Sequence, residues 1–231
     1  MKRIFFYVAS IAVCTFTAES NVKAQDFYLG VEGTPQMSWL VNRNDINNKS
    51  FDYLGTFSGS FGINGQVNFT PSVGVAISAI YSIEGQRFEL SSIERRKRVD
   101  YVKIPLLFAY NFAIMDRSYM TIKLGPQLGI LANAKLKDDD RNDIKSDMTD
   151  AYEPLSFGGV AMFGAGFNLS DNVILETTLR VDGSFTNIED HNYRSHLNQP
   201  DGVQVNNLHR AATFPITAGL NFSLKYLIGS R

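Results

Sequence analysis

Apolar and polar residues alternate one by one along most of this chain, and that period of two constrains its fold more than any other feature. The clearest run extends from Val102 to Phe112. One face of it carries Val102, Ile104, Leu106, Phe108, Tyr110 and Phe112, and the other carries Lys103, Pro105, Leu107, Ala109 and Asn111. Successive side chains of a strand point to opposite faces, whereas a helical stripe would break this parity within two turns. The alternation therefore predicts an all-β protein.

The same pattern recurs in eight segments, and the connections between them differ in length. The segments cover about 26–41, 53–69, 73–84, 102–112, 118–134, 155–168, 173–187 and 211–227. Short connections at 70–72, 113–117 and 170–172 alternate with long polar stretches at about 42–52, 85–98, 135–154 and 188–210. Outer-membrane barrels combine an even strand number with this sorting of turns and loops. We therefore predict an eight-stranded antiparallel up-and-down transmembrane β-barrel with short periplasmic turns and long external loops.

The first 24 residues have the pattern of a secretory signal peptide. Lys2 and Arg3 precede an apolar run at 4–17 that is too short to span a bilayer comfortably. Cleavage after Ala24 would leave residues 25–231 as the barrel domain, exported to the bacterial outer membrane. An uncleaved membrane anchor is the alternative. Cys14, the single cysteine, lacks the small preceding residue that a lipoprotein signal requires.

Aromatic residues gather toward both ends of the predicted strands. Near the short turns these are Phe69, Tyr110, Phe112, Tyr119, Phe167, Phe222 and Tyr226, and near the long loops they are Tyr81, Tyr101, Phe157, Phe185 and Phe214. Membrane barrels carry two such aromatic girdles, one at each membrane interface. Ordinary core aromatics of a soluble β-protein are the alternative interpretation.

If the apolar faces meet lipid, the polar faces enclose a narrow lumen in which charged groups must pair. We expect Glu32, Lys103, Lys123, Glu176 and Arg180 to form hydrogen-bonded ion pairs that plug this lumen. An eight-stranded barrel has room for side chains and little else, which favours a plug over a conducting path. A soluble lipocalin-like carrier, the competing fold, would instead place apolar side chains inside and polar ones outside.

Three motifs lie in the predicted strands: 101–107 (YVKIPLL), 125–129 (GPQLG) followed by Ala134-Lys135, and 157–159 (FGG) followed by 164–166 (GAG). Together they resemble the small outer-membrane barrels of Bacteroidota that are called PorT-like, over essentially the whole mature chain. The resemblance implies an eight-stranded outer-membrane barrel. Because the namesake is tied to a type IX protein secretion system, it also implies envelope or secretion-system proteins as partners. The chain departs from the usual pattern by continuing past Tyr226, the last aromatic of the final strand, through 227–231.

Two groups of residues resemble metal sites without matching one. The three histidines, His191, His196 and His209, share the last long loop with acidic residues, but their spacing fits no metal motif. The run 138–142 begins like a calcium loop, yet Asp143 occupies the glycine position and Thr149 the position of the final glutamate. Solvated loops are the simpler interpretation of both groups.

Other kinds of chemistry leave no signature in the sequence. It has neither a Gly-rich phosphate loop nor a nucleophile elbow, and its near-balanced charge of −1 does not favour nucleic acid. We therefore predict no enzyme activity, no cofactor and no metal.

A basic run, Arg95, Arg96, Lys97 and Arg98, is expected just outside the fourth strand, close to the membrane surface. Lipid A phosphates lie at that level, so the run predicts charge-assisted contacts with outer-membrane lipid and lipopolysaccharide. A solvated loop is the alternative. The overall expectation is a structural, adhesive or envelope-accessory barrel, with a secretion-system component or a small pore as alternatives.

Overall fold

The computed structural model describes residues 26–42, 54–90, 93–138, 146–147, 149–188 and 213–229, with the backbone alone at 42, 54, 86–90, 93–97, 136–138 and 146–147. Eight long strands form nearly all of it: β1 (Asp26–Asn42), β2 (Leu54–Asn68), β3 (Val73–Leu90), β4 (Ile93–Met115), β5 (Ser118–Asp138), β7 (Leu155–Asn168), β8 (Val173–Ser184) and β9 (Thr213–Gly229). A short β6 (Ser146–Asp147) and a 3₁₀ turn, η1 (Thr149–Ala151), complete the described elements. No helix among these residues is long and apolar enough to cross a membrane.

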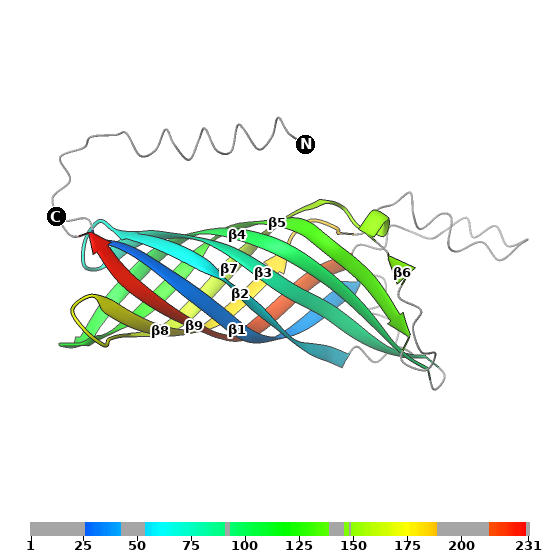
Figure 1. Ribbon diagram of the computed structural model, residues 1–231, viewed down its shortest axis with the longest axis horizontal. Coiled ribbons are helices and arrows are strands. Elements are labelled where there is room, and N and C mark those ends of the chain that lie inside the picture. The colour runs from blue at the N-terminus through cyan, green and yellow to red at the C-terminus, as the bar shows by residue number, and fades with distance from the viewer. Residues whose placement is uncertain are drawn as a thin grey trace, which may run out of the picture.

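The strands close into a barrel, as Figure 1 shows. Every long strand pairs antiparallel with its neighbours in chain order, β4 pairs with β5, and β1 pairs with both β2 and β9. The pairings Asp26↔Asn68 and Phe27↔Gly229 bring both ends of the described chain to the end that carries the short turns. The predicted eight-stranded up-and-down barrel is confirmed.

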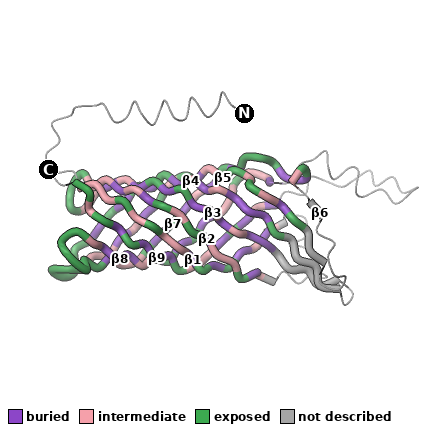
Figure 2. Tube along the Cα trace, in the orientation of Figure 1, coloured by how far each residue is buried: buried purple, intermediate pink, exposed green. Residues whose placement is uncertain are grey.

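The barrel has an apolar exterior and a polar interior. Outward-facing side chains such as Phe57, Phe61 and Ile63 are 73%, 61% and 61% exposed, while inward-facing Glu176, Thr178 and Arg180 are at most 2% exposed. Figure 2 shows this alternation of buried and exposed residues along each strand. Because a soluble barrel has the reverse arrangement, the predicted parity is correct and a lipocalin-like carrier is excluded.

The strands β3, β4 and β5 extend further toward the long-loop end than the sequence predicts. The expected loop at 85–98 is instead mostly a hairpin, in which Gly85 pairs with Arg98 and Leu90 with Ile93. Most of these positions are polar, with Phe88, Leu90 and Ile93 as the apolar exceptions, so they lack the sustained alternation that marks a strand. Hydrogen bonding to the neighbouring strand still orders their backbone. As a result, this side of the barrel projects beyond the rest (Figure 1).

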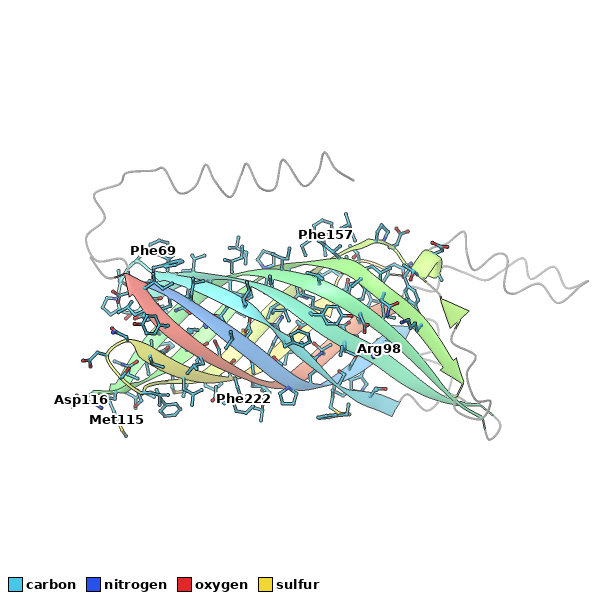
Figure 3. All side chains as sticks on the ribbon, viewed as in Figure 1. Phe69, Arg98, Met115, Asp116, Phe157 and Phe222 are labelled. Carbon is cyan, nitrogen blue, oxygen red and sulfur yellow. The ribbon has the colours of Figure 1, made fainter. Side chains whose placement is uncertain are left out.

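Two aromatic residues assigned to the girdles point into the lumen instead. Tyr101 is 1% exposed, and the hydroxyl of Tyr119 donates a hydrogen bond to Glu176 at 3.3 Å. Tyr101 is two residues from inward-facing Lys103, and Tyr119 is four residues from inward-facing Lys123. Residues an even number apart on a strand share a face, so both tyrosines point inward at any depth in the membrane. The other girdle members lie on the outer wall, most of them exposed and Tyr81 and Phe214 half-buried. Figure 3 shows Phe69 and Phe157 projecting outward from different parts of the barrel.

Two prolines interrupt the ladder between β4 and β5. Pro105 pairs with Gln127 and Phe108 with Leu124 in one register, but the residues between these pairs do not pair across the two strands. A Cβ on Gly125 would overlap the carbonyl oxygen of Leu106, so glycine alone fits this close approach. The Ile-Pro and Gly-Pro motifs thus have a structural explanation.

Candidate functional site

The lumen holds two groups of buried charges, and the first centres on Glu176 of β8. Its carboxylate forms ion pairs with Lys123 of β5 and with Lys225 of β9, the latter at 2.6 Å. Lys225 also donates to Oε1 of Gln66 at 2.7 Å. The strand β7 lies between the strands of Glu176 and Lys123, and β1 lies between those of Lys225 and Gln66, so these two bonds span part of the lumen, whereas β8 and β9 are neighbours. We call these residues, together with Tyr119, the Glu176 cluster.

The second group centres on Lys103 of β4 and Asp182 of β8, and we call it the Asp182 cluster. Lys103 forms ion pairs with both Asp182 and Glu84 of β3. Arg180 donates from Nε to Asp182 at 2.9 Å and from Nη2 to Oε1 of Gln127 at 2.9 Å. Since β5 and β7 separate β4 from β8 in the sheet, the Lys103–Asp182 pair crosses the lumen.

Four of the five predicted luminal residues, Lys103, Lys123, Glu176 and Arg180, lie in these ion pairs. Glu32 does not join them. Its Oε2 accepts a hydrogen bond from Asn221 at 3.0 Å, and its buried Oε1 has no hydrogen-bond partner among the described residues. Glu32 therefore lies in the lumen as a hydrogen-bonded carboxylate rather than as a partner of a cation.

The ion-pair network predicted from the sequence does not include Glu84, Asp182 and Lys225. Asp182 and Lys225 have the inward parity of their strands, which placed them on the polar face without indicating their partners. Glu84 closes the predicted third strand and precedes an expected loop, so nothing marked it as luminal. With these three, the described lumen contains four cations and four carboxylates and is electrically balanced.

Very little space remains between these side chains. The internal hollow beside the Glu176 cluster, lined also by Glu32 and Asn64, has a volume of about 10 Å³. That is roughly the space that one water molecule needs. An inward apolar patch, formed by Ala76, Leu107, Val160 and Met162, fills the adjacent wall. In the part of the barrel that the structure describes, the lumen is packed rather than open.

An apolar cluster closes the lumen toward the long-loop end. Its members are Leu40, Val99, Tyr101 and Ala134 from the strands, and Ala151, Tyr152 and Ile188 from the connections. Backbone hydrogen bonds hold the connections in place: the amide of Leu131 donates to Pro154 at 2.9 Å, and that of Glu153 donates to Ile188 at 2.8 Å. The described parts of these connections, at 149–154 and 185–188, therefore pack over the polar lumen at this end.

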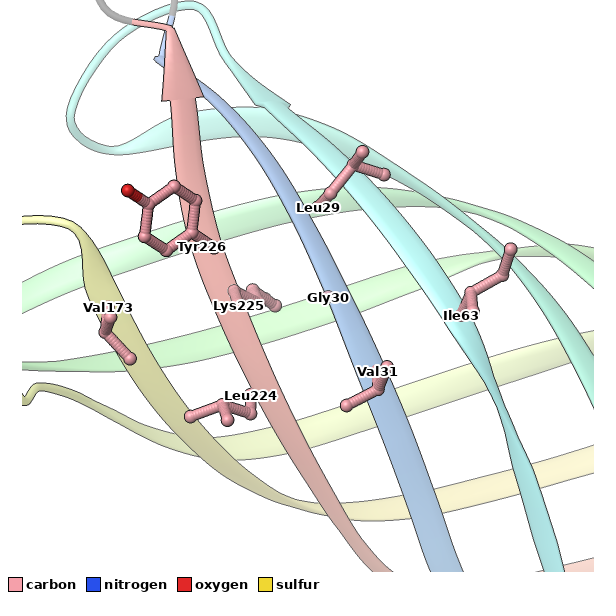
Figure 4. Close-up of a pocket in the computed structure, with 8 residues that line it drawn as sticks. All are labelled: Leu29, Gly30, Val31, Ile63, Val173, Leu224, Lys225 and Tyr226. Atoms are coloured by element: carbon pink, nitrogen blue, oxygen red, sulfur yellow. The ribbon is translucent and has the colours of Figure 1, made fainter.

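On the part of the outer wall that the structure describes, the hollows are open and mostly apolar. Figure 4 shows one of about 470 Å³ at the seam between β1 and β9, lined by Leu29, Gly30, Val31, Ile63, Val173, Leu224, Lys225 and Tyr226. Lys225 contributes no charge there, because its ammonium group bonds to Gln66 and Glu176 inside the barrel. Such a surface suits lipid chains rather than a polar substrate.

The basic run lies within β4 rather than outside the strand, because the hairpin with β3 continues past it. Of its four side chains the structure describes that of Arg98, which is 48% exposed and bonds to Asp100 at 2.8 Å. This hydrogen bond raises the pKa of the Arg98 guanidinium above its ordinary value, so the guanidinium stays charged.

Several predicted features lie outside the described residues. They are the signal peptide, His191, His196 and His209, and most of the calcium-like run at 138–142. Among the residues that the structure does describe, no group of three His, Cys, Asp or Glu side chains could hold a metal ion.

No curated protein matches the chain, whereas several solved structures of outer-membrane proteins do. Neisserial surface protein A (NspA) is 11% identical, with 87% of this chain and 97% of that one covered and a TM-score of 0.47. OprG from Pseudomonas aeruginosa is 11% identical, with 89% and 96% covered and a TM-score of 0.47. Ail, the attachment invasion locus protein of Yersinia pestis, is 13% identical, with 88% and 99% covered and a TM-score of 0.40.

The family model described as "Outer membrane protein beta-barrel domain" matches residues 23–190, which is well over half of the chain. The narrower resemblance to PorT-like barrels stays a prediction. With a closed barrel, an apolar exterior and this match, the chain belongs to the outer membrane protein β-barrel domain family.

Proposed function

We propose that this protein is a sealed, non-enzymatic barrel of the bacterial outer membrane with a structural or adhesive role at the cell surface. The observation that carries the proposal is the filled lumen, which the Lys103–Asp182 ion pair crosses from β4 to β8. A barrel closed in this way anchors its external segments without providing a path for solutes. Its function then lies in what its external end contacts.

The energetics of the ion pairs favour a permanent seal. Removing one member of a buried pair leaves an uncompensated charge and costs about 3–5 kcal/mol. Opening a path between Lys103 and Asp182 would separate both from their partners at once, and the apolar cluster at the mouth would have to move as well. At a cost of this size the open state would be populated at less than about 1%.

The test is conductance of the full-length mature protein in planar lipid bilayers, after a heat-shifted band on SDS-PAGE has shown that the barrel is folded. We expect no stepwise channel currents, whereas a wide porin inserted in the same bilayers serves as the positive control. Reproducible single-channel steps from the folded protein would contradict the sealed barrel and favour a small pore.

A further inference from the structure

Two buried oxygen atoms in the lumen face one small hollow, and neither has a hydrogen-bond partner among the described residues. They are Oε1 of Glu32 on β1 and Oδ1 of Asn64 on β2. Asn64 is 6% exposed, and both side chains line the hollow of about 10 Å³ beside the Glu176 cluster. Because an unsatisfied buried acceptor is unfavourable, each of these oxygens requires a donor that lies inside the hollow.

The remaining hydrogen bonds of the two side chains hold them at neighbouring positions of β9. Oε2 of Glu32 accepts from Nδ2 of Asn221 at 3.0 Å, and Nδ2 of Asn64 donates to Oγ of Ser223 at 2.9 Å. Asn221 and Ser223 are two residues apart, so they share the inward face of the strand. Neither side chain can turn its free oxygen away from the hollow without breaking one of these bonds.

Lys225 of β9 lies beside Asn64 because glycine occupies the position between them. Gly30 of β1 pairs with Asn64 in one ladder and with Lys225 in the other. A Cβ on Gly30 would lie 2.9 Å from Oδ1 of Asn64 and 3.0 Å from Cγ of Lys225, so both side chains lie over the glycine. The ammonium group of Lys225 donates to Gln66 at 2.7 Å and to Glu176 at 2.6 Å. These two bonds leave one of its three N–H donors.

The charge and the volume of the hollow point to water as its ligand. Two carboxylates and two ammonium groups line it, so their formal charges cancel; they are Glu32, Glu176, Lys123 and Lys225. A metal cation would add a charge next to the ammonium groups, and an anion would add one next to the carboxylates, so both are unfavourable. A hollow of about 10 Å³ has roughly the space for one water molecule, which can donate two hydrogen bonds and accept two.

We propose that one ordered water molecule is a fixed part of this lumen. It donates to Oε1 of Glu32 and to Oδ1 of Asn64, and it accepts from the third N–H of Lys225. Glu32 is thereby linked to the Glu176 cluster through the water, and the network includes β1 and β2 as well as β5, β8 and β9. This water site follows from the packed interior and does not depend on a role at the cell surface.

The first experiment is a high-resolution crystal structure of the full-length mature protein. We expect a density peak about 2.7–3.2 Å from each of the two free oxygens and from Nζ of Lys225. Density at the shorter distances of a coordinated metal ion, about 2.0–2.6 Å, would overturn the proposal, as would the absence of any peak in this hollow.

The second experiment counts slowly exchanging internal water molecules by magnetic relaxation dispersion of the solvent, with the protein folded in detergent micelles. The variant N64L removes one acceptor and fills the hollow, and the matched control N168L makes the same change at an exposed position at the end of β7. We expect the count to fall by one in N64L and to stay unchanged in N168L, while both keep the heat-shifted band. An unchanged count in folded N64L would contradict the water site.

An infrared spectrum of the same protein tests the one arrangement that needs no water. A proton on Glu32 could be donated directly to Asn64, and it would give a protonated-carboxyl band that the variant E32Q lacks. We expect no band that E32Q removes. Such a band would show that a proton takes the place of the water, and the proposal would then be wrong.

Discussion

Glu176 shows how a single side chain organises the interior. One carboxylate pairs with Lys123 and Lys225 and also accepts from the hydroxyl of Tyr119 at 3.3 Å. Lys123 and Tyr119 come from β5 and Lys225 from β9, so the one residue of β8 connects two further strands. Desolvating so many charges is costly, and the clusters are stabilising only as complete sets.

Replacing this carboxylate by its neutral isostere should therefore strongly lower the stability of the barrel. We expect Glu176→Gln to destabilise the barrel by about 3–5 kcal/mol, because two buried ammonium groups lose their shared partner. The measurement is the free energy of unfolding by urea in lipid vesicles.

Glu153→Gln provides the matched control, since Glu153 is exposed and the change should be nearly neutral. Similar losses in the two variants would show that the Glu176 cluster does not stabilise the fold.

The pair β4–β5 is the element in which local sequence and packing are most closely connected. Both strands contain a proline where their ladder is interrupted, which is unusual because proline is normally confined to edges and bulges. Leu106 and Leu107 pair with β3 instead, and Gly125 and Pro126 pair with β7. The interruption is tolerated because the residues that do not pair in this ladder pair on the other side of their strands.

The close approach at this interruption leads to a prediction for Gly125. A methyl group there would overlap the carbonyl oxygen of Leu106 and lie 3.0 Å from Cα of Leu107, both backbone atoms that cannot move independently. We expect Gly125→Ala to destabilise the barrel by about 1–3 kcal/mol, measured as the temperature at which the folded band converts on SDS-PAGE.

The matched variant is Gly59→Ala, whose new methyl group would find its nearest neighbour, the Thr34 carbonyl oxygen, at 3.7 Å. It should leave that temperature unchanged or slightly higher. If both substitutions act alike, steric approach is not the reason for the glycine.

At the scale of the whole molecule, the membrane acts as the solvent of the outer wall. Large apolar side chains cover it around the entire barrel, including Leu179 of β8 at 52% exposure and Leu220 of β9 at 50%. Transfer of such a surface to water would be unfavourable, and each strand hydrogen-bonds on both sides so that no backbone edge meets lipid. The membrane therefore requires both a closed barrel and an apolar outer wall.

The membrane predicts that the cost of introducing a charge depends on how deep the position lies along a strand. Leu179 lies in the middle of β8, whereas Phe185 follows its end and is 76% exposed. We expect Leu179→Arg to cost about 2–4 kcal/mol and Phe185→Arg about 0–1 kcal/mol, because charge is least tolerated at the bilayer midplane. The measurement is again the free energy of unfolding in lipid vesicles. Equal costs at the two positions would contradict the assigned membrane span.

The sequence by itself determined the number of long strands, the face on which most side chains lie and the end of the barrel at which each connection lies, because all three follow from a period of two and from turn residues that are local in the chain. Even Tyr101 and Tyr119, assigned to the girdles, obey the parity of their own strands. Local pattern is decisive here because two unlike solvents, lipid and the lumen, act on opposite faces.

Only the tertiary structure decided which charges meet. Lys103 and Asp182 are 79 residues apart and lie on strands separated by two others, so their contact depends on closure and tilt of the barrel rather than on any local signal. The same holds for Glu84, which lies where the alternation ends although β3 itself continues to Leu90. It also holds for Glu32, which accepts a hydrogen bond from Asn221. Pairing across a lumen is a property of the closed sheet, and no single strand encodes it.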